Sequence, residues 1–203
     1  MAEVKPQDRY LVVNGLRLHY LDWGNEGGQA MLLLHGFTTM CHAWDFFAPA
    51  FRDSYHVLAL DQRGHGESQW SEDAAYTTED HLVDIAGFVD ALNLDRFILV
   101  GHSMGGRNAM MYAGCFPHRV ARLIVVDSRP DNDPAAAEAL RQLLINIPQE
   151  VGSIDELAQE LVRLYPYLSL DICRHLASYG LKQMSDGKYS PKYDLRMREQ
   201  AER

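Results

Sequence analysis

The chain has 203 residues, with 19 Lys and Arg against 28 Asp and Glu, and a formal net charge of −9. This length suits one good-sized domain, and an acidic chain without a basic run argues against a nucleic-acid partner. The 47% apolar and 23% charged composition is that of a globular protein. No apolar run reaches the ~18 residues that span a bilayer, and the first residues lack the apolar core of a secretory signal. Three widely spaced cysteines, Cys41, Cys115 and Cys173, predict free thiols, so we expect a cytoplasmic protein with no membrane partner.

The first part of the chain alternates strand and helix patterns. Residues 10–13 and 16–22 are β-rich and flank Asn14-Gly15, a pair typical of a two-residue hairpin turn. Four short apolar runs follow, at residues 30–34, 56–60, 97–100 and 122–126. Helices are predicted over residues 78–92, with Thr77 or Thr78 as cap, and over residues 103–116. This order predicts an α/β fold: a mostly parallel sheet with helices on both faces.

The pattern changes after Asp127. Asp133-Pro134 predicts the start of a helix that ends near residue 147, and Ser153 with Glu156 predicts a capping box. Further helices are expected at residues 169–179, ended by Gly180, and at 193–203, with a turn at Asp186-Gly187 between them. We therefore predict a core over residues 1–128 and a helical cap without strands over 129–203.

The strongest motif is Gly101-His102-Ser103-Met104-Gly105, directly after a predicted strand and before a predicted helix. This is the context of a nucleophile elbow, in which glycines allow a sharp turn that exposes the serine. The helix dipole favours negative charge at that end of the helix. We therefore predict Ser103 as a catalytic nucleophile.

A second segment, Leu34-His35-Gly36-Phe37, follows another predicted strand. Acyl transfer needs two donors directed at the developing oxyanion. We expect these to be the backbone N–H groups of Phe37 and Met104, the latter being the residue after the nucleophile. His35 is expected to fix the loop by hydrogen bonding rather than to catalyse.

With HGF at 35–37, DQRGHGES at 61–68 and GHSMGG at 101–106, the chain resembles the α/β-hydrolase superfamily, over about residues 10–130. Within it, the chain is similar to members of the 2-(acetamidomethylene)succinate hydrolase type. The resemblance implies a core with strands one to six, a cap in place of residues 129–203, and structural roles for Arg63 and His65. It also implies two further strands and a catalytic histidine after the cap, which this sequence does not contain.

Asp127 is the candidate catalytic acid. The strand before it should lie parallel to the strand before Ser103, and neighbouring parallel strands end at the same rim of a sheet. A carboxylate there could orient an imidazole that bridges to the serine. The resemblance agrees, because a minority of the superfamily places the acid after strand six. A structural role for Asp127 in the next loop is the alternative.

We therefore predict a serine hydrolase that cleaves an ester, lactone, amide or activated C–C bond of a small carbonyl substrate through an acyl-enzyme. A non-catalytic binding module and a cofactor-free haloperoxidase-like activity are the alternatives. No histidine in the chain is favoured as the base, and four arginines are possible anion contacts: Arg107, Arg129, Arg163 and Arg174. The spacing of metal-ligating residues predicts no metal, and no cofactor is expected. A complementary C-terminal fragment or second chain, or a second copy, is expected to pair with the edge strand at 122–126.

Overall fold

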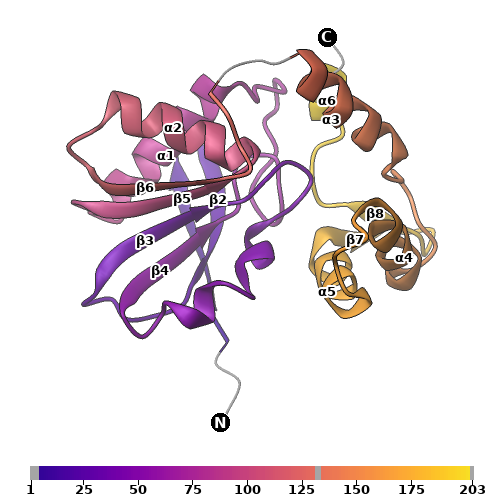
Figure 1. Ribbon diagram of the computed structural model, residues 1–203, viewed down its shortest axis with the longest axis horizontal. Coiled ribbons are helices and arrows are strands. Elements are labelled where there is room, and N and C mark those ends of the chain that lie inside the picture. The colour runs from indigo at the N-terminus through magenta and orange to yellow at the C-terminus, as the bar shows by residue number, and fades with distance from the viewer. Residues whose placement is uncertain (1–4, 131–133, 202–203) are drawn as a thin grey trace. The chain divides into compact units, whose positions relative to one another are not determined.

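The computed structural model describes residues 5–130 and 134–201, which are shown in Figure 1. They belong to two compact units, Met1–Pro130 and Asp131–Arg203, and each unit is described by itself. None of the helices in the described ranges combines the length and the apolar character that crossing a membrane requires.

The first unit is built on a six-stranded sheet of order β1-β2-β4-β3-β5-β6. Its strands are β1 (Gln7–Val13), β2 (Leu16–Asp22), β3 (Gln29–Leu34), β4 (Tyr55–Leu60), β5 (Phe97–His102) and β6 (Val120–Val126). The pairs from β4 to β6 are parallel, whereas β1 pairs antiparallel with β2, and β2 with β4. The predicted Asn14-Gly15 turn joins β1 and β2, and both of its residues have positive φ. The predicted α/β class is confirmed.

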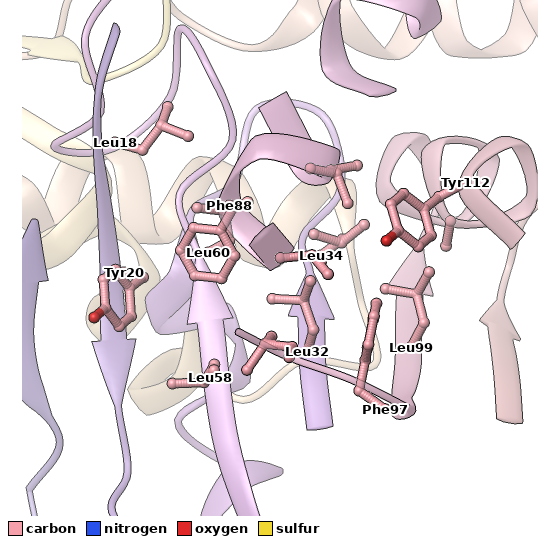
Figure 2. Packing of buried hydrophobic residues seen from close by; sticks show 14 of the residues in the cluster. Leu18, Tyr20, Leu32, Leu34, Leu58, Leu60, Phe88, Phe97, Leu99 and Tyr112 are labelled. Atoms are coloured by element: carbon pink, nitrogen blue, oxygen red, sulfur yellow. The ribbon is translucent and has the colours of Figure 1, made fainter. Parts of the chain in front are cut away.

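Alternate residues of the central strands enter two separate cores. Leu32, Leu58 and Leu99 pack with helices α1 (Thr78–Ala91) and α2 (Met104–Cys115), which lie on one face of the sheet (Figures 1 and 2). Leu33, Ala59 and Val100 point to the other face. They pack there with the 3₁₀ helices η1 (Cys41–Trp44) and η2 (Ala48–Ala50). Burial on both faces explains why these strands are apolar without alternation.

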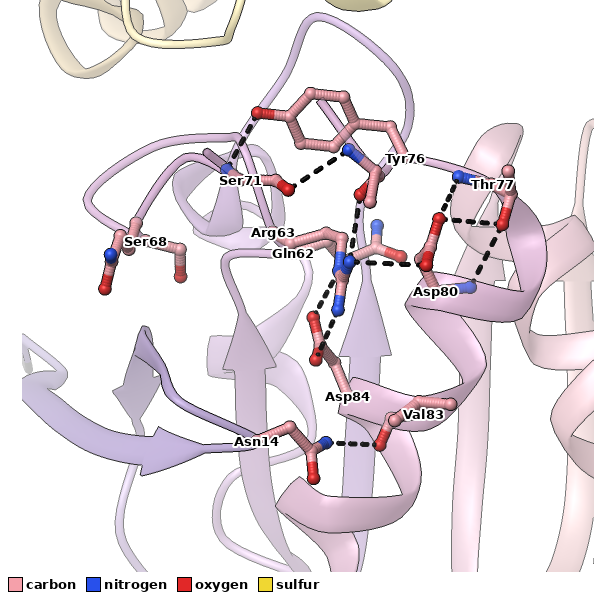
Figure 3. Close-up of polar contacts among 12 residues, drawn as sticks. Asn14, Gln62, Arg63, Ser68, Ser71, Tyr76, Thr77, Asp80, Val83 and Asp84 are labelled. Carbon is pink, nitrogen blue, oxygen red and sulfur yellow. Dashed lines mark hydrogen bonds and ion pairs between the residues drawn. The ribbon is translucent and has the colours of Figure 1, made fainter. Parts of the chain in front are cut away.

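Helix α1 starts where the sequence predicts. The Thr77 side chain accepts from the backbone N–H of Asp80, and the Asp80 carboxylate accepts from the N–H of Thr77, which completes a capping box (Figure 3). One turn later, Asp84 accepts two hydrogen bonds from the guanidinium of Arg63, at 2.6 and 2.8 Å. Both side chains are buried, so this pair ties the loop after β4 to α1, as the structural role predicted for Arg63 requires.

Strand β6 differs from the other parallel strands. In the described part of the chain it pairs with β5 alone. Its large apolar side chains are exposed: Leu123 by 38%, and Ile124 and Val126 by 42% each. An apolar strand with one unpaired edge is a template for pairing with another strand.

The second unit contains α3 (Pro134–Asn146), α4 (Ile154–Leu164), α5 (Leu170–Gly180) and α6 (Arg196–Ala201). Asp133, the predicted cap of α3, lies outside the described residues. Ser153 caps α4 as predicted by accepting from the N–H of Glu156, but the Glu156 carboxylate accepts from Gly152 instead of closing the predicted box.

The prediction of a cap without strands is wrong. Strands β7 (Leu181–Gln183) and β8 (Tyr189–Pro191) form an antiparallel hairpin around the predicted Asp186-Gly187 turn, in which Gly187 has a φ of 87°. Because β7 continues directly from α5, Gly180 is the last residue of that helix rather than the residue beyond it. The last helix, predicted at 193–203, begins only at Arg196.

Candidate active site

Ser103 lies at the junction of β5 and α2. Its backbone has a φ of 50° and a ψ of −116°, a region that costs a non-glycine residue about 1–3 kcal/mol. The N–H of Ser103 donates to the carbonyl oxygen of Val126 at 3.0 Å, and the Ser103 carbonyl accepts from Arg107 at 3.1 Å in the first turn of α2. A strained serine held between a strand and a helix is the arrangement predicted for a nucleophile elbow.

Close packing explains the two glycines of the elbow. A Cβ on Gly101 would come within 2.6 Å of the carbonyl carbon of Gly105. A Cβ on Gly105 would in turn clash with the carbonyl oxygens of Leu34 and His35. The first turn of α2 therefore lies directly against β5 on one side and against the end of β3 on the other, which only residues without a side chain permit.

The loop after β3 reaches Ser103. A Cβ on Gly36 would lie 3.3 Å from the Cβ of Ser103 and 2.7 Å from Nδ1 of His102. Phe37, the next residue, is partly buried, and its ring meets that of His65 edge to face at 5.8 Å. Met104 is the first residue of α2. The two N–H groups predicted to bind an oxyanion thus both lie near the nucleophile: Phe37 follows Gly36, which packs against His102 and Ser103, and Met104 follows Ser103 directly. Their role in substrate binding stays a prediction.

Asp127 directly follows β6 and has a φ of 46°. In the parallel register His102 is opposite Val126, so the residues after each, Ser103 and Asp127, leave the same end of the sheet. Asp127 is exposed. Burial lowers the pKa of His102, and the negative charge of Asp127 opposes that effect. The catalytic role of Asp127 stays a prediction.

No histidine of residues 5–130 donates or accepts a hydrogen bond at Oγ of Ser103. His35 is buried, with Nδ1 2.8 Å from the carbonyl oxygen of Gly36 and Nε2 3.0 Å from the backbone nitrogen of Gln62. His65 is buried 3.0 Å from the carbonyl oxygen of Arg63, and His42 lies 2.8 Å from the carboxylate of Asp45. These contacts agree with the loop-fixing role predicted for His35 and the structural role predicted for His65.

The predicted anion contacts are all exposed arginines. In the second unit, Arg174 donates to Asp155 at 2.7 Å, and Arg163 pairs with Glu160. In the first unit, Arg107 and Arg129 project from the first turn of α2 and from the loop after Asp127. Exposed ion pairs contribute little to stability, so the pairs of Arg163 and Arg174 can open at little cost.

Side chains far apart in sequence form a buried cluster that the spacing of metal-ligating residues did not predict. His19, Cys41 and Asp61 offer three ligand atoms within 4.8 Å of one another. However, the oxygens of Asp61 already accept from Nδ1 of His19 at 2.7 Å and from the N–H groups of Cys41 and Glu67 at 2.7 and 2.9 Å. The cluster therefore serves as a hydrogen-bond network, and a metal ion would have to displace the His19 contact.

A pair of buried amides was also missed. Asn108 Nδ2 donates to Gln62 Oε1 at 2.7 Å, across 46 positions of sequence. Gln62 belongs to the DQRGHGES segment and Asn108 follows the elbow, so both motifs were visible. Their contact was not, because it depends on how β4 and α2 pack.

Comparison with known proteins agrees with the fold. The family described as "alpha/beta hydrolase fold" matches residues 29–163. The crystal structure of E-2-(acetamidomethylene)succinate hydrolase superposes with a TM-score of 0.89 at 28% identity, over 97% of this chain and 72% of that one.

Three curated relatives show the range of named activities. N-formylmaleamate deformylase of Pseudomonas putida is 36% identical over 70% of this chain and 50% of its own length. 2-(Acetamidomethylene)succinate hydrolase of Mesorhizobium japonicum is 31% identical over 79% of this chain and 57% of its own length. Mouse epoxide hydrolase 4 is 37% identical over 56% of this chain and 32% of its own length. The chain therefore spans about a third to somewhat over half of the length of these relatives.

Proposed function

Because the chain belongs to the α/β-hydrolase fold family, we propose that it is a serine hydrolase acting on an ester, lactone, amide or activated C–C bond of a small carbonyl substrate. The observation that carries the proposal is the backbone of Ser103. A φ of 50° at a non-glycine residue is maintained by hydrogen bonds on both sides and by close-packed glycines around the turn. Strain of this kind is typical of functional positions.

In the proposed reaction Oγ of Ser103 attacks the substrate carbonyl carbon and loses its proton to a general base. The carbonyl oxygen becomes an oxyanion that accepts hydrogen bonds from the N–H groups of Phe37 and Met104. Collapse of this intermediate breaks the bond to the leaving group, which takes up the proton from the base. Water then attacks the acyl-enzyme by the same route and releases the acid and free Ser103.

Asp127 is proposed to orient the base, which we place on a segment that pairs with the free edge of β6. A strand beside β6 would end at the same rim as Asp127, and a histidine after it could bridge to Ser103. The exposed apolar side chains Leu123, Ile124 and Val126 support pairing at this edge.

A serine at position 103 also favours acyl transfer over epoxide opening. Epoxide hydrolases and dehalogenases of this superfamily use an aspartate as nucleophile, and the elbow here has Ser103 in that place. The names of two relatives, a deformylase and a succinate-derivative hydrolase, agree with chemistry at a carbonyl group.

Hydrolysis of p-nitrophenyl acetate tests the proposal. In the protein with the segment that supplies the base bound, Ser103→Ala should lower kcat by ~10³-fold or more, because the nucleophile is lost. Ser178→Ala is the matched control, since Ser178 is an exposed residue of α5 that donates within its own helix, to the carbonyl oxygen of Arg174. Wild-type activity in Ser103→Ala would overturn the serine mechanism.

A further inference from the structure

The loop that carries Phe37 is held at both ends by two consecutive residues. At its start, Gln62 donates its backbone N–H to Nε2 of His35 at 3.0 Å and its side-chain Nε2 to the carbonyl oxygen of His35 at 2.7 Å. At its end, the carboxylate of Asp61 accepts from the N–H of Cys41 at 2.7 Å. All four residues are at most 2% exposed, so water does not compete for these bonds.

The same chain of hydrogen bonds reaches the helix of the nucleophile. Asn108 lies in α2, four residues after Met104, and donates from Nδ2 to Oε1 of Gln62 at 2.7 Å. Asn108 is 1% exposed. The segments that supply the two proposed oxyanion donors, Phe37 and Met104, are therefore connected through buried amides.

The donor and the acceptor of each hydrogen bond in this series can be assigned. The carbonyl oxygen of His35 can only accept, so Gln62 must present its NH₂ group to it and its oxygen to Asn108. Asn108 must then be a donor. Burial lowers the pKa of His35, and in the neutral ring Nε2 accepts from Gln62 while Nδ1–H donates to the carbonyl oxygen of Gly36 at 2.8 Å.

The last bond fixes the orientation of the Phe37 N–H. The carbonyl oxygen of Gly36 and the N–H of Phe37 belong to one planar trans peptide group, so they point in opposite directions. That carbonyl also accepts from Thr39, from Oγ1 at 2.9 Å and from the backbone N–H at 3.3 Å. Holding the Gly36 oxygen therefore aims the Phe37 N–H away from the buried side of the loop.

We propose that Asn108 and Gln62 are positioning residues, which act through His35 to hold the Phe37 N–H in the geometry needed to bind the oxyanion. The proposal rests on the proposed serine-hydrolase function. An oxyanion contact forms fully only in the transition state, so its misalignment lowers kcat with little effect on KM.

Asn108→Asp and Gln62→Glu each break one link at nearly constant size. A carboxylate at 108 has no hydrogen for Gln62, and a carboxylate at 62 has none for the His35 carbonyl. Asn108→Ser is a milder variant that introduces no charge, for use if either of the others does not fold. Asn146→Asp is the control, because it makes the same chemical change at an exposed helix position.

With p-nitrophenyl acetate and the base-carrying segment bound, we expect kcat to fall about 10-fold or more in the variants of Asn108 and Gln62, with KM within about twofold of wild type. Asn146→Asp should match wild type. A kcat within twofold of wild type in folded Asn108→Ser and Gln62→Glu would overturn the proposal. A similar loss of kcat/KM that came entirely from a higher KM would also overturn it.

Amide hydrogen exchange separates failure of this proposal from failure of the serine mechanism, because it needs no activity. Breaking this series of hydrogen bonds should accelerate exchange at the Thr39 and Gln62 amides by about 10-fold. Asn146→Asp should leave both amides unchanged. If Ser103→Ala retains activity but Thr39 exchange responds to Asn108→Ser, the proposed function fails and the loop connection stands. Unchanged exchange at both amides would overturn the positioning role.

Discussion

The backbone N–H of Ser103 donates a hydrogen bond to the carbonyl oxygen of Val126 over 3.0 Å. This bond extends the β5–β6 ladder by one step past the end of β5 and brings the start of the elbow to the residue before Asp127. The candidate nucleophile and the candidate acid are therefore positioned by the same pair of parallel strands.

With the base-carrying segment bound, Asp127→Asn should lower the hydrolysis rate about 10-fold or more while changing the melting temperature by only a few degrees. The backbone of residue 127 has a φ of 46°, and asparagine adopts this left-handed region as readily as aspartate does. The loss therefore reports on the carboxylate rather than on folding. Steady-state kinetics with a thermal melt check this, and full activity in Asp127→Asn would place the acid elsewhere.

Ser103→Gly should be more stable than Ser103→Ala by about 1 kcal/mol, although both are inactive. Glycine adopts a φ of 50° and a ψ of −116° without a steric cost, whereas alanine retains the strain. Urea unfolding of the two variants measures the difference. Equal or lower stability for Ser103→Gly would show that the turn stores no strain.

Two glycines of the same helix should respond in opposite ways to substitution. Gly105→Ala places a Cβ 2.5 Å from the backbone oxygen of His35, and we expect a loss of about 3 kcal/mol or more. A Cβ added to Gly114 in the same helix would meet nothing within 4 Å, so Gly114→Ala should be neutral or stabilising by up to about 1 kcal/mol. Denaturant unfolding distinguishes them, and similar values would refute the close approach of α2 to the end of β3.

The His19–Asp61 pair should make stability depend on pH in both directions. Burial alone would raise the pKa of Asp61, but the hydrogen bond and charge of His19, with the neighbouring ring of His35, lower it to about 2. This contribution of about 2 kcal/mol is present above the ordinary carboxyl pKa and is lost as the pH falls from about 4 to 2.

Burial also opposes protonation of His19, but Asp61 and Asp8 outweigh it and raise the pKa. The stability that this ion pair adds is complete below the ordinary histidine pKa and is lost as the pH rises through the raised value. Urea unfolding between pH 2 and 9 measures both effects. His19→Gln should remove the alkaline loss, whereas His118→Gln, at an exposed position, should retain it; an unchanged alkaline slope in His19→Gln would contradict the assignment.

The edge of β6 should drive association of the purified chain when no complementary segment is bound. Ile124→Lys places a charge on this edge and should lower the mass measured by size exclusion with light scattering. Val83→Lys is the control, because Val83 is an apolar residue of α1 with 53% exposure. A wild-type monomer with a sharp thermal transition would contradict pairing at β6.

The local patterns predicted the sheet and its helices well, because the sheet strands β1–β6 and helices α1 and α2 each have a strong signal of their own. Asn14-Gly15 forms a turn, Thr77 caps α1, and central strands buried on both faces are continuously apolar. The hairpin β7–β8 was missed because its strands have only three residues each and include Lys182 and Pro191. Only its turn carried a signal.

The positions of Ser103 and Asp127 were predictable, because each residue directly follows one of two neighbouring parallel strands; their catalytic roles stay predictions. The site was not predictable where two side chains meet through tertiary packing. Nothing in the order of residues indicates that Asn108 contacts Gln62, or that His19 and Cys41 meet at Asp61. Such contacts depend on the distance between packed elements.

The most direct test of the account is reaction of the protein with a fluorophosphonate, followed by mass spectrometry of its peptides. Phosphonylation requires an activated nucleophile and a site for the developing oxyanion. With the segment that carries the base bound, we predict a single adduct on Ser103 that is absent from Ser103→Ala and unchanged in Ser178→Ala. An unlabelled Ser103, under conditions in which a known serine hydrolase reacts completely, would contradict the claim that this elbow holds a catalytic serine.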